Sequence, residues 1–388
     1  MRRVYLDHNA TTPLRPEARE LYLHELDRLG GNPSSVHAAG RRARALIDEA
    51  RQRVAAALDV GEEEVLFTSG GTESNNTALA GVLRPLGAGA GLVTSAVEHS
   101  SVLRAAAALE REGHPVVHVP VDGLARLDLD RLAAATAAPA CRLVAVVAAD
   151  NEVGVIHPLE TLGAALRAIP ARERPLLFTD AVQALGRVPL ELERWGADLA
   201  SFSAHKVGGP LGVGLLVRRR GVALAPLLHG GGQEGGARAG TENAPAIAAA
   251  ALACELAVRE REAFCARVGP LTHRLWAGVR AAVPAARLLG PPLAARDRLC
   301  NTLALWIPGV DGRVLVARLD LEGLAASAGS ACSSGSIEPS HVLMAMGLPA
   351  AEARAGLRLS LGRDTTPQDV HSAVDALRRT FGALARPR

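Results

Sequence analysis

The chain has 388 residues, of which 48% are hydrophobic and 21% are charged, and its formal net charge is +3. This balance is typical of a globular protein with a large buried core, and the length favours two domains. Because the net charge is small and acids are interleaved among the arginines, we expect no nucleic-acid partner. Because the sequence has no long apolar stretch, we expect no membrane partner.

The first part of the chain is expected to form an extended arm at residues 1–15 and helices at residues 15–29 and 38–58. From residue 65 onward, apolar runs alternate with helical patterns. The predicted strands are residues 65–68, 92–95, 116–119, 143–148, 176–179, 199–202 and 214–217. The predicted helices between them are residues 73–83, 100–112, 128–138 and 161–169. This alternation predicts a mostly parallel sheet covered on both faces, with one antiparallel strand after the short Gly-rich link near residue 209.

A Gly-rich loop at residues 230–241 precedes a single long helix predicted at residues 244–283, and a composition shift at residues 284–292 indicates a hinge. The remainder is typical of a smaller α+β unit, with predicted strands at residues 302–306, 324–327 and 356–361 and helices at residues 312–319 and from 368. We therefore predict an α/β protein with a large domain at residues 14–260 and a small domain of residues 1–13 and 261–388.

Lys206 is the only lysine among the 43 lysine and arginine residues of the chain. Arginine supplies the same charge, but only a lysine amine can lose its proton in the usable range and form an imine. A lysine beside His205, in a Gly-rich turn after an apolar strand, therefore indicates covalent binding of a carbonyl compound. The alternative is a surface lysine with no special role.

Polar residues follow five predicted strands, in segments 68–72, 95–99, 148–152, 179–183 and 202–206. Ligands of open α/β sheets bind at this edge, outside the carboxyl ends of the strands. The Ser-Gly-Gly-Thr run at residues 69–72 lies between a strand and a helix, where backbone N–H groups can hold a phosphate. The same residues also form ordinary helix caps.

Three further side chains are candidates for ligand contacts. Asp180 ends a buried strand, and a buried carboxylate needs a cationic partner such as the protonated ring nitrogen of pyridoxal phosphate; the alternative is a helix cap. His99 is suited to stacking on a cofactor ring and to proton transfer, or it is a hydrogen-bonded structural histidine. Arg358, a charge in an apolar strand, is expected to bind a carboxylate of the protein or of a substrate.

The chain has five cysteines, Cys141, Cys254, Cys265, Cys300 and Cys332. Their odd number and wide spacing argue against a disulfide framework and a zinc site, so we predict no metal. Four lie in apolar or helical contexts and are expected to be buried. Cys332 lies in a loop of small polar residues, which favours a mobile, accessible thiol over an inert surface cysteine. Since the first residues also lack the pattern of a secretory signal, we expect a cytoplasmic protein.

These motifs, spread in order over nearly the whole chain, resemble those of the cysteine desulfurases, pyridoxal-phosphate enzymes of fold type I in the class V aminotransferase family. The longer cysteine-bearing loop resembles that of the nitrogen-fixation and housekeeping iron–sulfur group. The segments that carry the resemblance are residues 5–13, 68–75, 98–99, 151–154, 180–183, 203–206, 238–241, 329–335, 338–343 and 359–363.

The resemblance implies a site for pyridoxal 5'-phosphate. Lys206 would form the imine with the cofactor, Asp180 would pair with its ring nitrogen, Gln183 would hydrogen-bond its ring oxygen, and His99 would stack on the ring. The resemblance also implies a homodimer in which both subunits hold the phosphate group. These phosphate contacts would come from Gly71, Thr72, Ser203, His205 and, from the other subunit, Thr241.

The resemblance further implies that Asn151 and Arg358 hold the carboxylate of L-cysteine, with Asn151 also close to the cofactor. Cys332 would attack the substrate sulfur and become a persulfide, releasing L-alanine. A sulfur acceptor such as an iron–sulfur scaffold would then take the sulfur. Many relatives carry Ala at the position of Gly71, and many carry Asn or Tyr at the position of His8.

Two other functions are compatible with parts of this pattern. A selenocysteine lyase or an aminotransferase of the same family would share the cofactor site, but an aminotransferase would not need Cys332. A sulfur carrier without catalytic activity would be expected to have lost the cofactor site, yet Lys206, Asp180 and His99 are all present.

Overall fold

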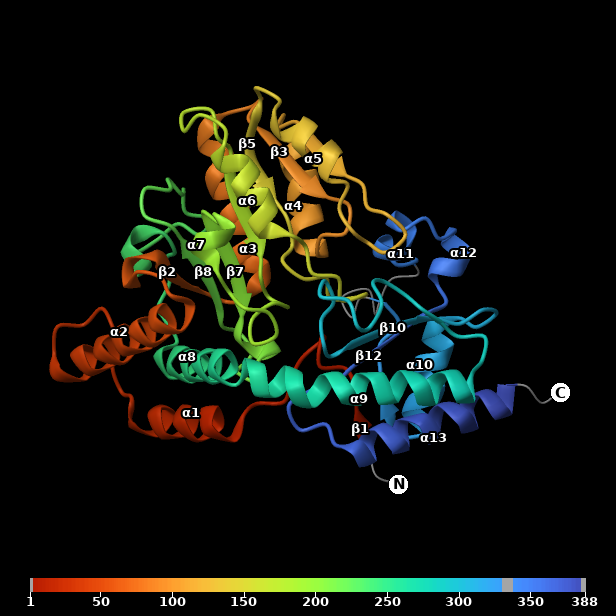
Figure 1. The fold of residues 1–388 in the computed structure, drawn as a ribbon. Helices are drawn as coiled ribbons and strands as arrows, with labels where there is room; N and C mark the ends of the chain where they lie inside the picture. The colour runs from red at the N-terminus through yellow and green to blue at the C-terminus, as the bar shows by residue number, and fades with distance from the viewer. Residues whose placement is uncertain (1–2, 330–337, 385–388) are drawn as a thin grey trace.

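The structure is a computed structural model that describes residues 3–329 and 338–384 (Figure 1). Its largest sheet has seven strands in the order β2-β8-β7-β6-β5-β3-β4. β8 runs antiparallel to both of its neighbours, and the other paired strands are parallel, which confirms the predicted sheet and its one antiparallel strand. These strands are β2 (Val65–Thr68), β3 (Gly91–Ser95), β4 (Val116–Val119), β5 (Cys141–Ala145), β6 (Leu176–Asp180), β7 (Leu199–Ser203) and β8 (Gly214–Arg218).

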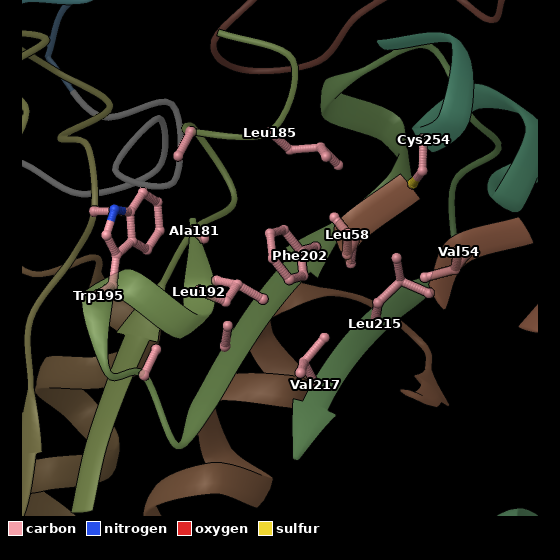
Figure 2. Close-up of a cluster of buried hydrophobic side chains, with 14 of the residues drawn as sticks. Val54, Leu58, Ala181, Leu185, Leu192, Trp195, Phe202, Leu215, Val217 and Cys254 are labelled. Carbon is pink, nitrogen blue, oxygen red and sulfur yellow. The ribbon is translucent and has the colours of Figure 1, made fainter. Parts of the chain in front are cut away.

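Apolar side chains are buried on both faces of this sheet. On β7, Leu199 contributes to one buried cluster, while Ala200 and Phe202 contribute to the other, as the alternation of side chains along a strand requires. Figure 2 shows the second cluster, in which Phe202 lies near Leu58 and Leu215. The helices in this part of the chain are α1 (Pro16–Arg28), α2 (Ala38–Leu58), α3 (Gly71–Leu83), α4 (Ser100–Arg111), α5 (Leu129–Thr136), α6 (Leu159–Arg167) and α7 (Leu192–Trp195).

The helix predicted at residues 244–283 is two helices, α8 (Ala244–Arg259) and α9 (Arg261–Ala282), so the prediction of one continuous helix was wrong. Glu260 ends one helix and begins the next, and its carboxylate accepts a 2.8 Å hydrogen bond from Arg15 Nη1. The apolar pattern continues past Glu260, and the ion pair with Arg15 comes from a segment far away in the sequence. The sequence pattern therefore did not mark the break.

The last third of the chain forms a second, smaller group of elements, at the lower right of Figure 1. Strands β9 (Arg287–Leu288), β10 (Thr302–Trp306) and β12 (Gly356–Ser360) form an antiparallel sheet. In the arm, β1 (Val4–Tyr5) pairs in parallel with β11 (Leu324–Ala325). This pairing supports assigning the arm to the small domain, and the boundaries at residues 13 and 260 stay a proposal. The helices here, beside α9, are α10 (Gly312–Leu321), α11 (His341–Ala345), α12 (Ala350–Ala353) and α13 (Pro367–Leu384).

The four described cysteines differ in burial. Cys141 and Cys254 are buried, as predicted, and burial raises the pKa of Cys254 to about 12. Cys265 and Cys300 are only half-buried, so the expectation that they are buried was wrong. Both lie where α9 approaches the segment before β10. The opening there is formed by segments that are distant in the sequence, so the residues next to each cysteine do not predict it.

Across residues 3–329 and 338–384, no helix has both the length and the apolar character needed to cross a membrane.

Candidate active site

A cavity of about 760 Å³, including its open mouth, lies at the carboxyl ends of the large sheet's strands and brings most of the predicted site residues together. Cys332 lies outside the described residues, and Thr241 is exposed and does not line the cavity. The predicted residues that do line it are Gly71, Thr72, His99, Asn151, Asp180, Gln183, Ser203, His205, Lys206 and Arg358.

Lys206 is positioned by the short 3-10 helix Ala204–Lys206 that follows β7, and its amine faces the N-terminal arm. Lys206 Nζ donates hydrogen bonds of 2.7 Å to Asn9 O and 2.7 Å to Ala10 O. The backbone carbonyl of Asn9 also accepts a 3.0 Å hydrogen bond from Gln183 Nε2. The arm therefore holds the side chains of both Lys206 and Gln183, a contact between segments that the sequence analysis did not predict.

Asp180, the last residue of β6, is 4% exposed. Its Oδ2 accepts a 2.7 Å hydrogen bond from Asn75 Nδ2, and its Oδ1 accepts one of 3.0 Å from Val182 N. Both donors are neutral, so they orient the carboxylate without neutralising its charge. A buried carboxylate in this state is suited to a cationic group entering the cavity.

Asn75 is a site residue whose role the sequence analysis missed. From α3 it contacts Asp180, donates a 2.8 Å hydrogen bond to Ser101 Oγ, and accepts one from Ser201 Oγ. It lies four residues after Gly71, on the same face of the helix, and this spacing is the signal that could have identified it.

His99 caps the N-terminus of α4. The backbone N–H of Ser101 donates a 3.2 Å hydrogen bond to His99 Nδ1. Because Nδ1 accepts this bond, a neutral His99 carries its proton on Nε2. The cap thus fixes both the orientation and the tautomer of the ring.

The lining of the cavity also includes groups that can donate hydrogen bonds to an anion. Gly71 and Thr72 begin α3, whose first backbone N–H groups have no partner within the helix. His205 Nδ1 lies 3.1 Å from Thr11 Oγ1, and burial, together with the charge of Lys206, lowers the pKa of His205 to about 4. A Cβ added at Gly71 would lie 2.9 Å from Val182 Cγ2, so glycine lets Val182 pack closely against the start of α3.

Arg358 lies on β12 and is 2% exposed. Its Nη2 forms a 2.7 Å ion pair with Asp7 Oδ1, and its Nη1 donates a 2.9 Å hydrogen bond to Asn151 O. The sequence predicted that Arg358 binds a carboxylate of the protein or of a substrate, and in the structure it binds the carboxylate of Asp7. Arg358 Nε is buried and has no hydrogen-bond partner among the described residues.

Behind the cavity, Glu98 is completely buried, and its Oε1 accepts hydrogen bonds of 2.6 Å from Ser95 Oγ and 2.8 Å from Val147 N. Burial raises the pKa of Glu98 to about 8, and the nearby Asp180 and Asp150 charges act in the same direction. The protonated, neutral form is therefore the one that the fold accommodates.

We expect Glu98→Gln to stabilise the protein near neutral pH. The folded-state pKa of Glu98 lies above its ordinary value, so its contribution to stability is complete below pH 4.5 and declines as the pH rises towards 8. The neutral amide avoids this loss, worth roughly 3 kcal/mol at pH 7. Thermal unfolding from pH 4.5 to 8 should show the variant's advantage growing with pH. An advantage that is constant over this range would contradict the assignment.

The profile of the class-V aminotransferases matches residues 4–372. The chain belongs to the class V aminotransferase family. It is 41% identical over 385 residues to a cysteine desulfurase IscS of Dictyoglomus turgidum, covering 99% of this chain and 95% of that one. It is 42% identical over 379 residues to a cysteine desulfurase of Cereibacter sphaeroides, covering 97% and 95%.

Solved structures of this family have the same fold. One of a NifS-like protein superposes with a TM-score of 0.90 at 34% identity, covering 98% of this chain and 100% of that chain. A NifS-like protein from Rickettsia africae gives a TM-score of 0.87 at 29% identity, covering 98% and 99%. The chain therefore has the fold of the pyridoxal-phosphate enzymes of fold type I, which confirms the predicted fold class.

The residues of the cavity fit the cofactor of the family, pyridoxal 5'-phosphate. The cavity combines a lysine amine, a buried carboxylate that accepts hydrogen bonds from two neutral donors, and the helix N-terminus at Gly71 and Thr72. These groups match the aldehyde, the protonated ring nitrogen and the phosphate of the cofactor, respectively.

Proposed function

We infer that the protein is a pyridoxal-phosphate-dependent cysteine desulfurase, which takes sulfur from L-cysteine and leaves L-alanine. The observation that carries this inference is the placement of the chain's only lysine and the buried Asp180 in one cavity. The full-length similarity to curated cysteine desulfurases supplies the reaction and the substrate. Another relative, SspA, has been solved in complex with cysteine.

We propose that Lys206 binds the cofactor covalently and that Asp180, aligned by Asn75, keeps the ring nitrogen protonated. Gln183 and His99 would contact the ring, while the phosphate would be held by Gly71, Thr72, Ser203 and His205. When bound, pyridoxal phosphate withdraws electrons from the bonds around the substrate's α-carbon. The contribution of the chain is to orient this group and to hold protons at defined atoms.

We propose that Arg358 and Asn151 position the substrate's carboxylate. Arg358 is held by Asp7 through Nη2 and reaches the cavity on the side of Asn151. The ion pair fixes the guanidinium plane before a substrate arrives, so less side-chain entropy is lost on binding. Asp7 therefore acts as a positioning residue for Arg358.

Cys332 is proposed to receive the sulfur. Its thiolate forms a bond to the sulfur of the bound cysteine, and the carbon–sulfur bond breaks with its electron pair remaining on the substrate carbon. That carbon then takes up a proton, so the products are L-alanine and a persulfide on Cys332. We propose that a protein acceptor such as an iron–sulfur scaffold removes the outer sulfur in the cytoplasm.

Product analysis tests this function against the other activities of the family. The purified protein, supplied with pyridoxal phosphate, L-cysteine and a thiol reductant, should release alanine and sulfide in equal amounts. Formation of a keto acid without alanine would instead indicate an aminotransferase. A strong preference for selenocysteine would indicate a selenocysteine lyase.

We predict that the active unit is a homodimer in which Thr241 completes the phosphate site of the partner subunit. Thr241 is exposed in the single chain and lies outside its cavity, as a residue that contacts a second copy would be. Thr241→Val should weaken cofactor binding roughly tenfold, the loss of about one hydrogen bond to a charged group, whereas Thr241→Ser retains the hydroxyl and should bind normally. Titration of the apoprotein with pyridoxal phosphate measures this effect.

Sedimentation at assay concentration tests the dimer itself. A fully active protein that sediments as a monomer would rule out the shared site, whatever the effect of the substitution.

A further inference from the structure

Two thiols that are 35 residues apart in the sequence face each other outside the cofactor cavity. Cys265 lies on α9 and Cys300 lies just before β10, and their sulfur atoms are 3.2 Å apart. A disulfide has a sulfur–sulfur bond of about 2.05 Å, so an approach of about 1 Å would join them. The cysteines elsewhere in the described chain, Cys141 and Cys254, are buried.

The pair is open to solvent. Both residues are half-buried and line a cavity of about 860 Å³, including its mouth, together with Arg187, His273 and Arg296. The hydrogen bond from the Cys300 thiol lowers the pKa of Cys265 below its ordinary value, and the charges of Arg261 and Arg187 act in the same direction against the effect of burial. Cys265 thus has the thiolate character that makes a cysteine nucleophilic.

Two hydrogen-bonded connections run from this pair to Lys206. On one side, Cys265 Sγ lies 3.4 Å from Arg187 O, and Arg187 Nη2 donates a 3.2 Å hydrogen bond to Lys206 O. On the other side, Cys300 is followed by Asn301, whose Nδ2 donates a 3.1 Å hydrogen bond to Asn9 Oδ1. The backbone carbonyl of Asn9 in turn accepts the hydrogen bond from Lys206 Nζ.

We propose that Cys265 and Cys300 are a redox-active dithiol that hydroperoxides convert to a disulfide, and that this disulfide disturbs the site around Lys206. The first part stands independently of the proposed function, whereas the loss of desulfurase activity expected from the second part rests on it. Closing the pair moves α9 and the segment at residues 300–301 towards each other. Arg187 and Asn9 contact these segments directly, so their hydrogen bonds to Lys206 change.

The chemistry balances with one hydroperoxide for each disulfide. The Cys265 thiolate attacks the peroxide, the oxygen–oxygen bond breaks, and the sulfur becomes a sulfenic acid while an alcohol or water leaves. The Cys300 sulfur then attacks the Cys265 sulfur, the sulfur–oxygen bond breaks, and water leaves. A dithiol reductant restores both thiols by exchange.

Hydrogen peroxide tests the disulfide directly in a Cys332→Ala background, in which the proposed catalytic thiol cannot react. Intact mass should fall by the mass of two hydrogen atoms, and digestion should yield one peptide pair joined through Cys265 and Cys300. Cys265→Ser and Cys300→Ser should each prevent the change, and Cys141→Ala should not. A dithiol reductant should restore the original mass.

The proposal fails if the mass is unchanged by peroxide or if the joined peptides contain a different cysteine pair. If the serine variants do not fold, alkylation replaces them: peroxide should protect Cys265 and Cys300 together, and protection of neither would also overturn the disulfide. The second part is tested on protein in which Cys332 is intact. After peroxide treatment, a dithiol should restore the activity that the parent protein has lost, and the Cys300→Ser variant should keep that activity during the treatment. A disulfide formed without any change in cofactor absorbance or in kcat and KM would overturn the coupling to Lys206.

Discussion

Lys206→Arg is expected to abolish covalent attachment of the cofactor and to reduce turnover by at least about a thousandfold, the scale typical of losing an essential reacting group. The guanidinium can still donate hydrogen bonds to the carbonyls of Asn9 and Ala10, so the fold and the arm should be retained. What is lost is an amine that can be deprotonated and can react with an aldehyde. The thermal midpoint should therefore stay close to that of the parent protein.

Reduction with borohydride measures the attachment without ambiguity, since this chain has no other lysine. In the parent protein the cofactor's mass should be found on the peptide that contains residue 206. The Lys206→Arg variant should carry no cofactor mass on this peptide. The control variant Arg220→Lys, which adds an exposed lysine, should carry the cofactor only on residue 206. Normal cysteine-dependent turnover in Lys206→Arg would disprove the assignment of this lysine.

Cys332→Ala and Cys332→Ser are expected to separate substrate binding from sulfur transfer. Adding cysteine should still change the visible absorption of the bound cofactor, because the residues proposed to hold substrate and cofactor are intact. Sulfide release should fall to background, since a hydroxyl is a far poorer nucleophile than a thiolate and a methyl group is none. Rapid mixing followed by sulfide and alanine assays compares the two steps.

The matched controls are single substitutions of the other cysteines. Under reducing conditions, Cys141→Ala, Cys254→Ala, Cys265→Ser and Cys300→Ser should each retain most of the turnover. If one of these proves essential, or if a Cys332 variant releases sulfide at the parental rate, the proposed route of the sulfur is wrong.

The sequence predicted best those features that depend on neighbouring residues. Each strand of the large sheet was predicted within a few residues, because an apolar run and the polar residues at its carboxyl end lie side by side in the sequence. Lys206 was identified because it is the only lysine in a chain with 42 arginines and because it lies beside His205 in a Gly-rich turn after an apolar strand. The predicted strand ends placed Asp180 and Lys206 at the same edge of the sheet, and both residues line the cavity there.

Features made by distant segments could not be predicted in this way. The carbonyls of Asn9 and Ala10 reach Lys206 only because the arm folds back across the molecule. The contact between Cys265 and Cys300 depends on how α9 lies against the segment before β10, which local periodicity does not specify. Arg358 was recognised as needing a carboxylate, but only the packed structure identifies Asp7 as that carboxylate.

The pairing of β1 with β11 has a consequence for the order in which the protein is made. The arm is synthesised long before its partner strand at Leu324–Ala325, which follows the whole large sheet in the chain. The large sheet, which ends at Arg218, can form while the chain is still growing. Asn9 also forms hydrogen bonds with Thr302 and Ser360, so the full set of contacts of the arm forms only after Ser360 has been synthesised. The arm that holds Lys206 therefore reaches its final position only after the sheet that carries Lys206 has been synthesised.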